Sequence, residues 1–342
     1  MKRGGLIAAL PGAAFSASLA CAACIGAFSG PAAPATAAEV TDATGRTVTV
    51  PDHIRHVLPA GPPAAVLLAA IAPGRMTGFP GPVSAASRAA LDQAVGGLPV
   101  VPRLTGPQDS TAEVQSLHPD LILDYGSVAP RYAQLAQDTQ RKTGIPTVLF
   151  DGALENIPAV ARTLGKILEQ PEQAESVARF AEAILALPNP PGGKKRVLYA
   201  RGSDGTLTAA AGTDVTAVFA RLGWQVLAPD GTGTFRSAGA EAIAALDPDI
   251  IILADPAAKD VLGTAPWRDM RAVRDGHAYI APSVPFGWIE EPPSINRLLG
   301  VAWLRGGDPL TLAALFNSMV YGRALTPEQL QAIAGTTKSI TP

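Results

Sequence analysis

Polar and aromatic side chains stand where the chain is expected to leave buried strands, and these residues could bind a small ligand. In open α/β sheets, ligands lie beyond the carboxyl ends of the strands, where loops and helix N-termini converge. Arg201 follows one such strand, and its guanidinium could pair with a carboxylate, a chelate or an oxyanion; a surface arginine is the alternative. The candidate ligand-binding residues are Pro63, Phe79, Tyr125, Tyr199, Arg201, Arg236, Phe286 and Trp288.

The segment 285–294 is the most unusual one in the chain. It places Phe286 and Trp288 around a glycine and between prolines, which favours a rigid apolar surface. We expect Trp288 to line a ligand cleft; packing between two lobes is the alternative. The adjacent pair Glu290–Glu291 carries two like charges, which solvent would normally screen. Ser294 is expected to cap the helix that follows it.

The sequence contains no recognisable catalytic motif. It has neither a P-loop nor a G-x-S-x-G pattern. A zinc site needs three or four converging ligands, and the sequence shows no such set. Its four histidines are therefore expected in turns or on the surface. We therefore predict that the protein is not an enzyme, and that it uses no cofactor and no metal bound by its own side chains.

The first 38 residues have the pattern of an export signal. Two basic residues precede a long uncharged apolar stretch, and small residues at 35–38 form a cleavage site. Both cysteines, Cys21 and Cys24, lie in this segment, so cleavage would leave no disulfide and no thiolate. We expect an exported protein in the periplasm; an uncleaved membrane anchor and a lipid anchor on a cysteine are the alternatives.

The composition is that of a folded protein. Of the 342 residues, 47% are hydrophobic and 16% are charged, and this length suits two globular domains or one large one. The formal net charge of −2 argues against a nucleic-acid-binding protein, because such a protein needs a basic face to neutralise phosphates.

A repeated motif indicates two halves of similar architecture. Leu-His-Pro-Asp at 117–120 precedes one apolar run, and Leu-Asp-Pro-Asp at 246–249 precedes another. Proline disfavours helical geometry in the residue before it, so each motif ends a helix. The apolar runs are typical of strands buried on both faces, as in parallel sheets covered by helices. Strands that alternate with helical patterns predict an α/β fold.

A helical segment at 154–188 separates the two halves. The second of its two helices begins after Pro171 and runs for about 17 residues, which is ~25 Å at the usual rise. Such a helix could join two lobes as a stiff strut; a plain domain helix is the alternative. We predict a signal peptide at 1–38, an N-terminal lobe at 39–153, this connecting segment, and a C-terminal lobe at 189–342.

Several motifs occur in an order that resembles one known family. They are the sequence Asp-Ala-Thr-Gly-Arg at 42–46 in a hairpin pattern, the two Leu-x-Pro-Asp motifs, and a stretch from Trp267 to Tyr279. Together they resemble the iron-siderophore, cobalamin and haem class of periplasmic substrate-binding proteins of ABC importers. The resemblance implies two Rossmann-like lobes with parallel central sheets, connected by one long rigid helix (class III), with the ligand held between the lobes.

The resemblance also implies a function. It implies a monomer that captures a metal chelate, with a ferric siderophore as the first choice, and delivers it to an ABC permease in the inner membrane. Tyr125, Tyr199 and Trp288 would contact the organic surface of the chelate, while Arg201 and Arg236 would neutralise its negative groups. The metal would be bound through its chelator.

Other ligands and one other class of protein stay open at this point. The same fold could bind a molybdate or tungstate oxyanion, cobalamin or haem. A bare oxyanion would use backbone N–H groups at helix starts near Pro63 and Ser127. From a different class, a chelatase-like enzyme would need a His/Glu pair, and a nitrogenase-like enzyme would need cysteines.

Overall fold

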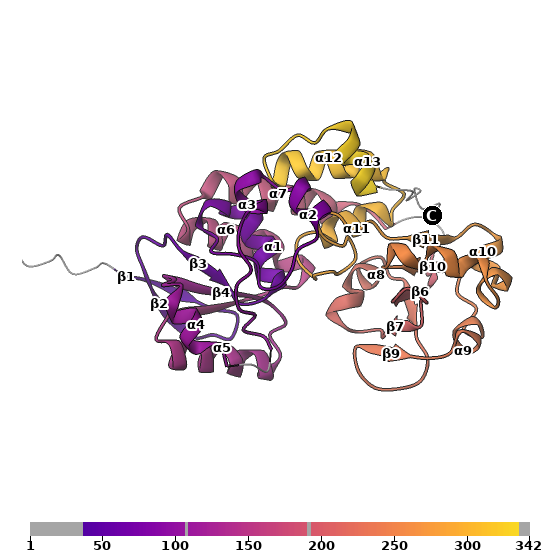
Figure 1. Ribbon diagram of the computed structural model, residues 1–342, viewed down its shortest axis with the longest axis horizontal. Helices are drawn as coiled ribbons and strands as arrows, with labels where there is room; N and C mark the ends of the chain where they lie inside the picture. The colour runs from indigo at the N-terminus through magenta and orange to yellow at the C-terminus, as the bar shows by residue number, and fades with distance from the viewer. Residues whose placement is uncertain (1–36, 107–108, 190–192, 335–342) are drawn as a thin grey trace, which may run out of the picture. The chain divides into compact units, whose positions relative to one another are not determined.

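The computed structural model describes residues 37–106, 109–189 and 193–334 (Figure 1). The predicted signal peptide, including both cysteines, lies outside the described residues except for its last two positions. Among the described residues, no helix is both long enough and apolar enough to cross a membrane.

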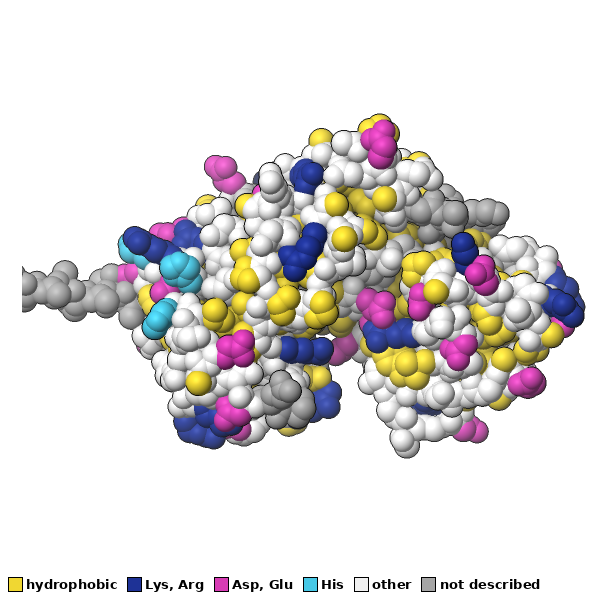
Figure 2. Space-filling view, viewed as in Figure 1, with side chains coloured by type: hydrophobic (Ala, Val, Ile, Leu, Met, Phe, Trp, Pro, Cys, Tyr) yellow, Lys and Arg dark blue, Asp and Glu magenta, His cyan; other side chains and the backbone are white. Residues whose placement is uncertain are grey.

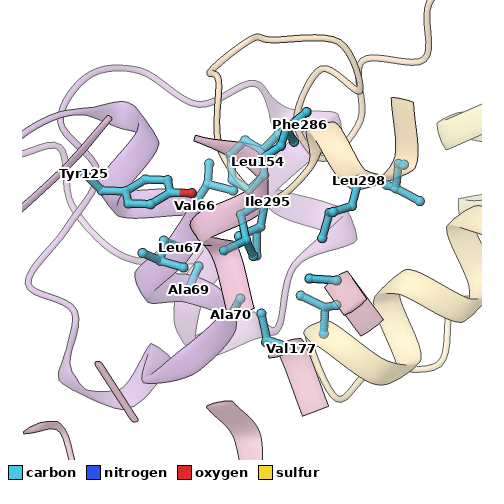
Figure 3. Close-up of a cluster of buried hydrophobic side chains, with 14 of the residues drawn as sticks. Val66, Leu67, Ala69, Ala70, Tyr125, Leu154, Val177, Phe286, Ile295 and Leu298 are labelled. Atoms are coloured by element: carbon cyan, nitrogen blue, oxygen red, sulfur yellow. The ribbon is translucent and has the colours of Figure 1, made fainter. Parts of the chain in front are cut away.

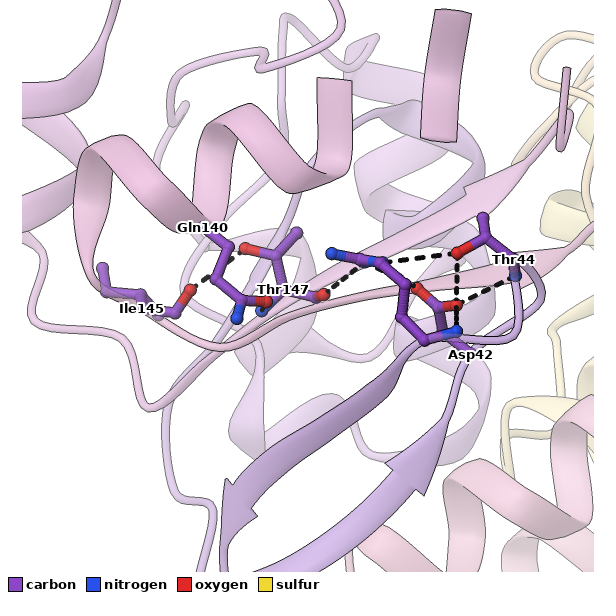
Figure 4. Close-up of polar contacts among 6 residues, drawn as sticks. Asp42, Thr44, Gln140, Ile145 and Thr147 are labelled. Atoms are coloured by element: carbon purple, nitrogen blue, oxygen red, sulfur yellow. Dashed lines mark hydrogen bonds and ion pairs between the residues drawn. The ribbon is translucent and has the colours of Figure 1, made fainter. Parts of the chain in front are cut away.

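An antiparallel hairpin of β1 (Ala37–Thr41) and β2 (Thr47–Pro51) precedes the first sheet. In its turn, Asp42 accepts hydrogen bonds from Thr44 and Arg46 (Figure 4). Burial acts to raise the pKa of the Asp42 carboxyl, but these hydrogen bonds bring it below its ordinary value. Arg46 also donates to the Thr147 carbonyl, 3.0 Å away, and so ties the hairpin to β5 (Thr147–Asp151).

The first sheet is parallel, in the order β3-β4-β5, with β3 at Val57–Pro59 and β4 at Leu121–Gly126. Its apolar strands are buried because helices cover both faces. Leu121 packs in the same cluster as α1 (Pro62–Ile71), whereas Ile122 packs with α4 (Thr111–Ser116) on the other face. The continuous apolar run after the first Leu-x-Pro-Asp motif is therefore a doubly covered strand, as predicted.

The second sheet has six strands in the order β11-β10-β6-β7-β9, with β8 paired to β6. Pairings among β6, β8, β10 and β11 are parallel, whereas β7 and β9 are antiparallel additions. The predicted parallel central sheet is thus present in the second half, and the antiparallel edge arises because a short hairpin connects β6 directly to β7. The bounds are β6 Arg196–Arg201, β7 Leu207–Ala209, β8 Gln225–Leu227, β9 Phe235–Ser237, β10 Ile250–Leu253 and β11 Ala278–Ile280.

Two helices connect the halves, α6 (Ile157–Ile167) and α7 (Pro171–Ala186). α7 contacts α1 of the first half, as well as α11 (Arg297–Trp303) and α12 (Pro309–Val320). Phe180 of α7 meets Phe316 of α12 edge to face, with ring centroids 5.4 Å apart. The α/β class and the two sheets joined by a long helix are confirmed, whereas the lobe boundaries stay a prediction.

One buried apolar cluster runs from the first half through α7 into the second. Figure 3 shows Val66 and Leu67 of α1 beside Ile295, with Val177 of α7 and Leu298 of α11 close by. The described residues accordingly belong to one compact unit. The remaining helices are η1 Pro73–Arg75, α2 Ala85–Ala90, α3 Gln93–Gly96, α5 Pro130–Thr143, η2 Leu154–Asn156, η3 Asp214–Thr216, α8 Ala217–Arg221, α9 Ala240–Ala244, η4 Pro256–Gly263, η5 Trp267–Asp269, α10 Arg271–Arg274 and α13 Pro327–Ala334.

Candidate functional site

A cavity of about 470 Å³, called here the cleft, is lined by residues of both halves. The first half contributes the carboxyl end of β4 and the start of α1, and the second half contributes the end of β6 and the loop that follows β11. The lining side chains that carry charge or an aromatic ring are Arg103, Asp124, Tyr125, Tyr132, Arg201, Asp214, Glu290 and Glu291. Acidic and basic side chains lie on both sides of the hollow that Figure 2 shows on this face.

A second cavity of about 340 Å³, called here the side pocket, adjoins the cleft. The two cavities share Pro62, Glu291 and Pro292 as lining residues. The side pocket is more apolar, and Phe79 and Phe286 both line it.

Glycines shape the first-half wall of the cleft. Gly152 follows β5 and donates a backbone hydrogen bond to the Gly126 carbonyl at 2.8 Å. A Cβ atom on Gly152 would lie 2.7 Å from the Gly126 Cα, so any side chain there would force two backbone segments apart. The ends of β4 and β5 therefore meet as bare backbone, next to Asp124 and Tyr125 of the wall.

Asp124 is the most unusual residue of this wall, because it is a carboxylate inside an otherwise apolar strand. Asp124 is 6% exposed, and the one hydrogen bond that its carboxylate accepts within the described residues comes from the Tyr125 N–H at 2.9 Å. Burial raises the pKa of the Asp124 carboxyl to about 6, and that single backbone hydrogen bond only partly opposes the shift.

Tyr125, the next residue, is 2% exposed and directs its ring toward α1 (Figure 3). Burial raises the pKa of its hydroxyl to about 12, although the nearby Arg297 guanidinium acts in the opposite direction. The phenol therefore stays protonated at neutral pH, and its hydroxyl oxygen is buried.

The second-half wall is built on an ion pair between Arg201 and Glu290. Arg201 binds the Glu290 carboxylate through two nitrogens, and its Nε lies 3.0 Å from a Glu291 oxygen. The Tyr199 hydroxyl donates to Glu290 at 2.8 Å, and the guanidinium lies 4.2 Å above the ring of Phe235. The prediction that solvent screens Glu290–Glu291 was wrong for Glu290, whose side chain is 1% exposed.

These contacts determine the charge states of the wall. Burial acts to lower the pKa of Arg201, but the Glu290 carboxylate raises it above its ordinary value, so the guanidinium stays charged. Burial also raises the pKa of the half-exposed Glu291. Because Arg201 already faces two carboxylates, its charge is neutralised before any ligand arrives.

The loop at 281–296, which follows β11 and carries Glu290, is held in place by close backbone packing. The Gly287 N–H donates to the Glu291 carbonyl at 2.7 Å and closes a tight turn. A Cβ on Gly300 of α11 would lie 2.2 Å from the Trp288 carbonyl, so the loop rests directly on the helix backbone. The Ser294 hydroxyl donates to the Pro63 carbonyl at 2.8 Å, and it does not cap the helix, which begins at Arg297.

A buried arginine joins the two walls beneath the cleft. Arg297 is 2% exposed, and it donates to the carbonyls of Gly152, Asp214 and Ser294. Within the described ranges no carboxylate lies at ion-pair distance from it. The guanidinium is instead satisfied by backbone oxygens from three separate segments, so it fixes the spacing between the halves.

The start of α1 offers few donors to an anion. The helix begins as predicted at Pro62, but Pro62 and Pro63 carry no N–H group, and the Ala65 N–H is bonded to Gly61. Ser127 is not a helix start, because α5 begins three residues later at Pro130.

The structure brings some of the predicted site residues together and not others. Pro63, Tyr125 and Arg201 line the cleft, and Phe79 and Phe286 line the side pocket. The Tyr199 hydroxyl donates to Glu290, and Arg236 donates to the Pro229 carbonyl at 2.8 Å. Neither residue lines the cleft or the side pocket. Trp288 is 0% exposed, which agrees with packing, the alternative to its place in a ligand cleft. Contact with a ligand stays a prediction for every one of these candidate residues.

No group of three or more His, Cys, Asp or Glu side chains in the described part of the chain is placed to hold a metal ion. Among the histidines, His53 lies 3.2 Å from Glu169 and His56 lies 3.7 Å from Asp120, both on the surface.

Comparison with known proteins identifies the family. The model of a family described as periplasmic binding protein matches residues 64–285, which is more than half of the chain. The chain therefore belongs to the periplasmic binding protein family, whose members are extracytoplasmic binding proteins. No curated protein gives a significant match.

Solved structures of similar fold come from several bacteria. An ABC transporter solute-binding protein from Sulfurospirillum deleyianum is 21% identical, with 86% of this chain and 98% of that chain covered and a TM-score of 0.76. The molybdate-binding MolA of Haemophilus influenzae is 16% identical over 85% and 99%, with a TM-score of 0.64. A TroA-like binding protein, FepB, from Veillonella parvula is 18% identical over 89% and 97%, with a TM-score of 0.58. The fold is thus that of class III periplasmic binding proteins.

Proposed function

We propose that this protein is the solute-binding component of an ABC importer, and that it captures a metal chelate in the cleft, with a ferric siderophore as the first choice. It then delivers the chelate unchanged to a permease in the inner membrane. The N-terminal segment would direct the chain to the periplasm, where it would act as a monomer.

The observation that carries this proposal is the polar chemistry of the cleft. Tyrosine residues, carboxylate residues and a carboxylate-bound arginine line a volume of about 470 Å³. Such walls suit the outer surface of an organic chelate, whose polar groups need partners and whose metal is already coordinated.

A bare oxyanion fits these walls less well. Four carboxylates line the cleft against two arginines, and one of those arginines, Arg201, is already paired with Glu290. The two prolines at the start of α1 also remove N–H donors that an oxyanion would use. Molybdate and tungstate are therefore outcomes of the test rather than the proposal.

A thermal unfolding screen of the purified protein tests the ligand class. Ferric trihydroxamates, haemin, cyanocobalamin and molybdate would each be added in turn. A ligand at ~100 times its Kd stabilises the folded state by about 2.7 kcal/mol, so a raised Tm with a ferric trihydroxamate is expected. Stabilisation by molybdate, haemin or cyanocobalamin alone would overturn the siderophore choice, and recovery of a chemically altered chelate would overturn the non-enzymatic role.

A pair of matched variants locates the site. Ser127 is a half-buried residue of the cleft, and Ser116 is an exposed serine at the end of α4. Ser127→Trp should fill the cleft and abolish the ligand-induced shift of Tm, whereas Ser116→Trp should leave that shift intact. Equal shifts in the two variants would place the ligand elsewhere.

A further inference from the structure

We propose that Asp124 is the specificity-determining residue of the cleft, and that its carboxylate binds a positively charged N–H donor, such as an ammonium, at the periphery of the ligand. This inference rests on the proposed function, because it takes the cleft to be the ligand site. It narrows the ligand to a chelate that carries a cationic group and disfavours polyanionic chelates.

The first argument is the unused hydrogen-bonding capacity of Asp124. A carboxylate has about four acceptor positions on its two oxygens. Within the described residues, Asp124 accepts one hydrogen bond, from the N–H of its own neighbour Tyr125. The side chain lines the cleft, so the free positions are open to a molecule bound there. A buried carboxylate is costly unless it is paired, and a ligand cation would supply the missing partner.

The second argument is that the protein's own cations are bound elsewhere. Arg201 lies on Glu290 and Glu291, and the Arg103 Nε donates to the Thr105 hydroxyl at 2.9 Å. Neither arginine lies at ion-pair distance from Asp124 in the described part of the chain. Asp124 therefore does not serve to position a basic side chain of the cleft wall.

The third argument is the sign of the charge around the cleft. The titratable groups that share it with Asp124 are Arg103, Tyr125, Tyr132, Arg201, Asp214, Glu290 and Glu291. With Asp124 these make four carboxylates and two guanidiniums, which gives an excess of negative charge when all are ionised. A recess lined by one sign of charge concentrates ligands of the opposite sign.

The charge state of the Asp124 carboxyl at neutral pH is the one that binding of a cation requires. Burial raises its pKa to about 6, so the carboxylate is ionised at neutral pH. A bound ammonium would favour the ionised form and lower the pKa again. Binding of a cationic ligand should therefore weaken as the pH falls through about 6, because protonation removes the charge that the ligand needs.

A matched pair of ligands tests the proposal without changing the protein. The ferric complex of desferrioxamine B has a neutral hydroxamate core and one free ammonium group, and N-acetylation removes that charge while keeping the core. Isothermal titration calorimetry at pH 7.5 would measure both. Wild-type protein should bind the ammonium form at least ~10-fold more tightly, which corresponds to about 1.4 kcal/mol.

Variants then assign the preference to the residue. Asp124→Asn keeps the shape of the side chain and removes its charge, so it should bind the two complexes with equal affinity. Asp275→Asn makes the same change at an exposed aspartate that lines neither cavity, and it should keep the wild-type preference. Near-ultraviolet circular dichroism would confirm that both variants are folded.

The outcomes separate the two proposals. Equal binding of both ferric complexes by wild-type protein, or a preference that survives in Asp124→Asn, overturns the role of Asp124 and leaves the proposed function in place. Binding of neither ferric complex, together with binding of molybdate, haemin or cyanocobalamin, overturns the choice of a siderophore.

Discussion

The two Leu-x-Pro-Asp turns of this protein have the same geometry, but the strands that follow them do not have the same chemistry. In both turns the residue before proline has a positive φ, +48° at His118 and +42° at Asp247. In both, the aspartate after proline accepts backbone N–H groups at the start of the neighbouring strand, from Arg55 and His56 to Asp120 and from Arg196 to Asp249. The turns are thus equivalent anchors for β4 and β10.

Four residues after each aspartate, the copies diverge. The first copy has Asp124, and the second has Leu253, which is 0% exposed and packs in the cluster of Trp267. Because the second sheet forms with leucine at this position, the fold itself does not require an acid there. The carboxylate in β4 is a local departure from the strand pattern, and such departures are expected at functional sites.

The largest effect is expected from placing an acid in the second copy. Leu253→Asp would bury an unpaired carboxyl among apolar side chains and remove the leucine packing, and we expect a loss of about 4 kcal/mol or more in the free energy of unfolding. Urea unfolding at pH 7.5 measures it.

The control for this change is Leu253→Met, which keeps the volume and should cost less than about 1.5 kcal/mol. If Leu253→Asp were as stable as Leu253→Met, the second strand would tolerate an acid, and the contrast with Asp124 would carry no functional meaning.

A second, smaller effect is expected at the wall opposite Asp124. Glu290→Gln would leave the half-buried Arg201 without its main counter-ion and should lower the free energy of unfolding by about 2–3 kcal/mol, since Arg201 retains partial solvent access. Glu291→Gln is the matched change at a side chain that is 44% exposed, and it should cost less than about 1 kcal/mol. Similar losses in both variants would mean that Glu290 is not the principal partner of Arg201. Urea unfolding again provides the measurement.

Much of the fold could be predicted because it depends on local patterns. The apolar run after each Leu-x-Pro-Asp motif is a buried strand, and the helix after Pro171 ends at Ala186, close to the predicted end. The antiparallel strands β7 and β9 were missed because each has only three residues with polar ones among them, Leu-Thr-Ala and Phe-Arg-Ser, so neither forms an apolar run.

The site could be predicted only in part, because its pairings join residues distant in sequence. Arg201 was a candidate, but its neutralisation depends on Glu290, 89 residues away. Trp288 was expected to line a cleft because aromatic residues around a glycine and between prolines favour a rigid apolar surface. The sequence could not show that Trp288 is buried, with the α11 backbone against its carbonyl. Asp124 had a usable signal that was missed: it is the one acidic residue within the run Leu121–Tyr125, which has the character of a doubly buried strand.

The smallest effect should be a gain of stability when the first copy loses its acid. In Asp124 the folded-state pKa, about 6, lies above the ordinary value of 3.8. The unfolded chain therefore releases this proton more readily, so the free energy of unfolding of the wild type falls as the pH rises from about 4 to about 6 and then levels off.

Asp124→Asn has no such group. Near pH 4 the variant should be slightly less stable than the wild type, because the amide accepts the Tyr125 N–H less strongly. At pH 8 it should be about 1–2 kcal/mol more stable, since the pKa shift changes the difference between the two proteins by roughly 2–3 kcal/mol over this range. Urea unfolding of both proteins at four pH values between 4 and 8 measures the difference. A difference that stays constant across this range would show that the Asp124 carboxyl does not titrate in the folded protein as its burial requires, and the position would then resemble Leu253 in its energetics.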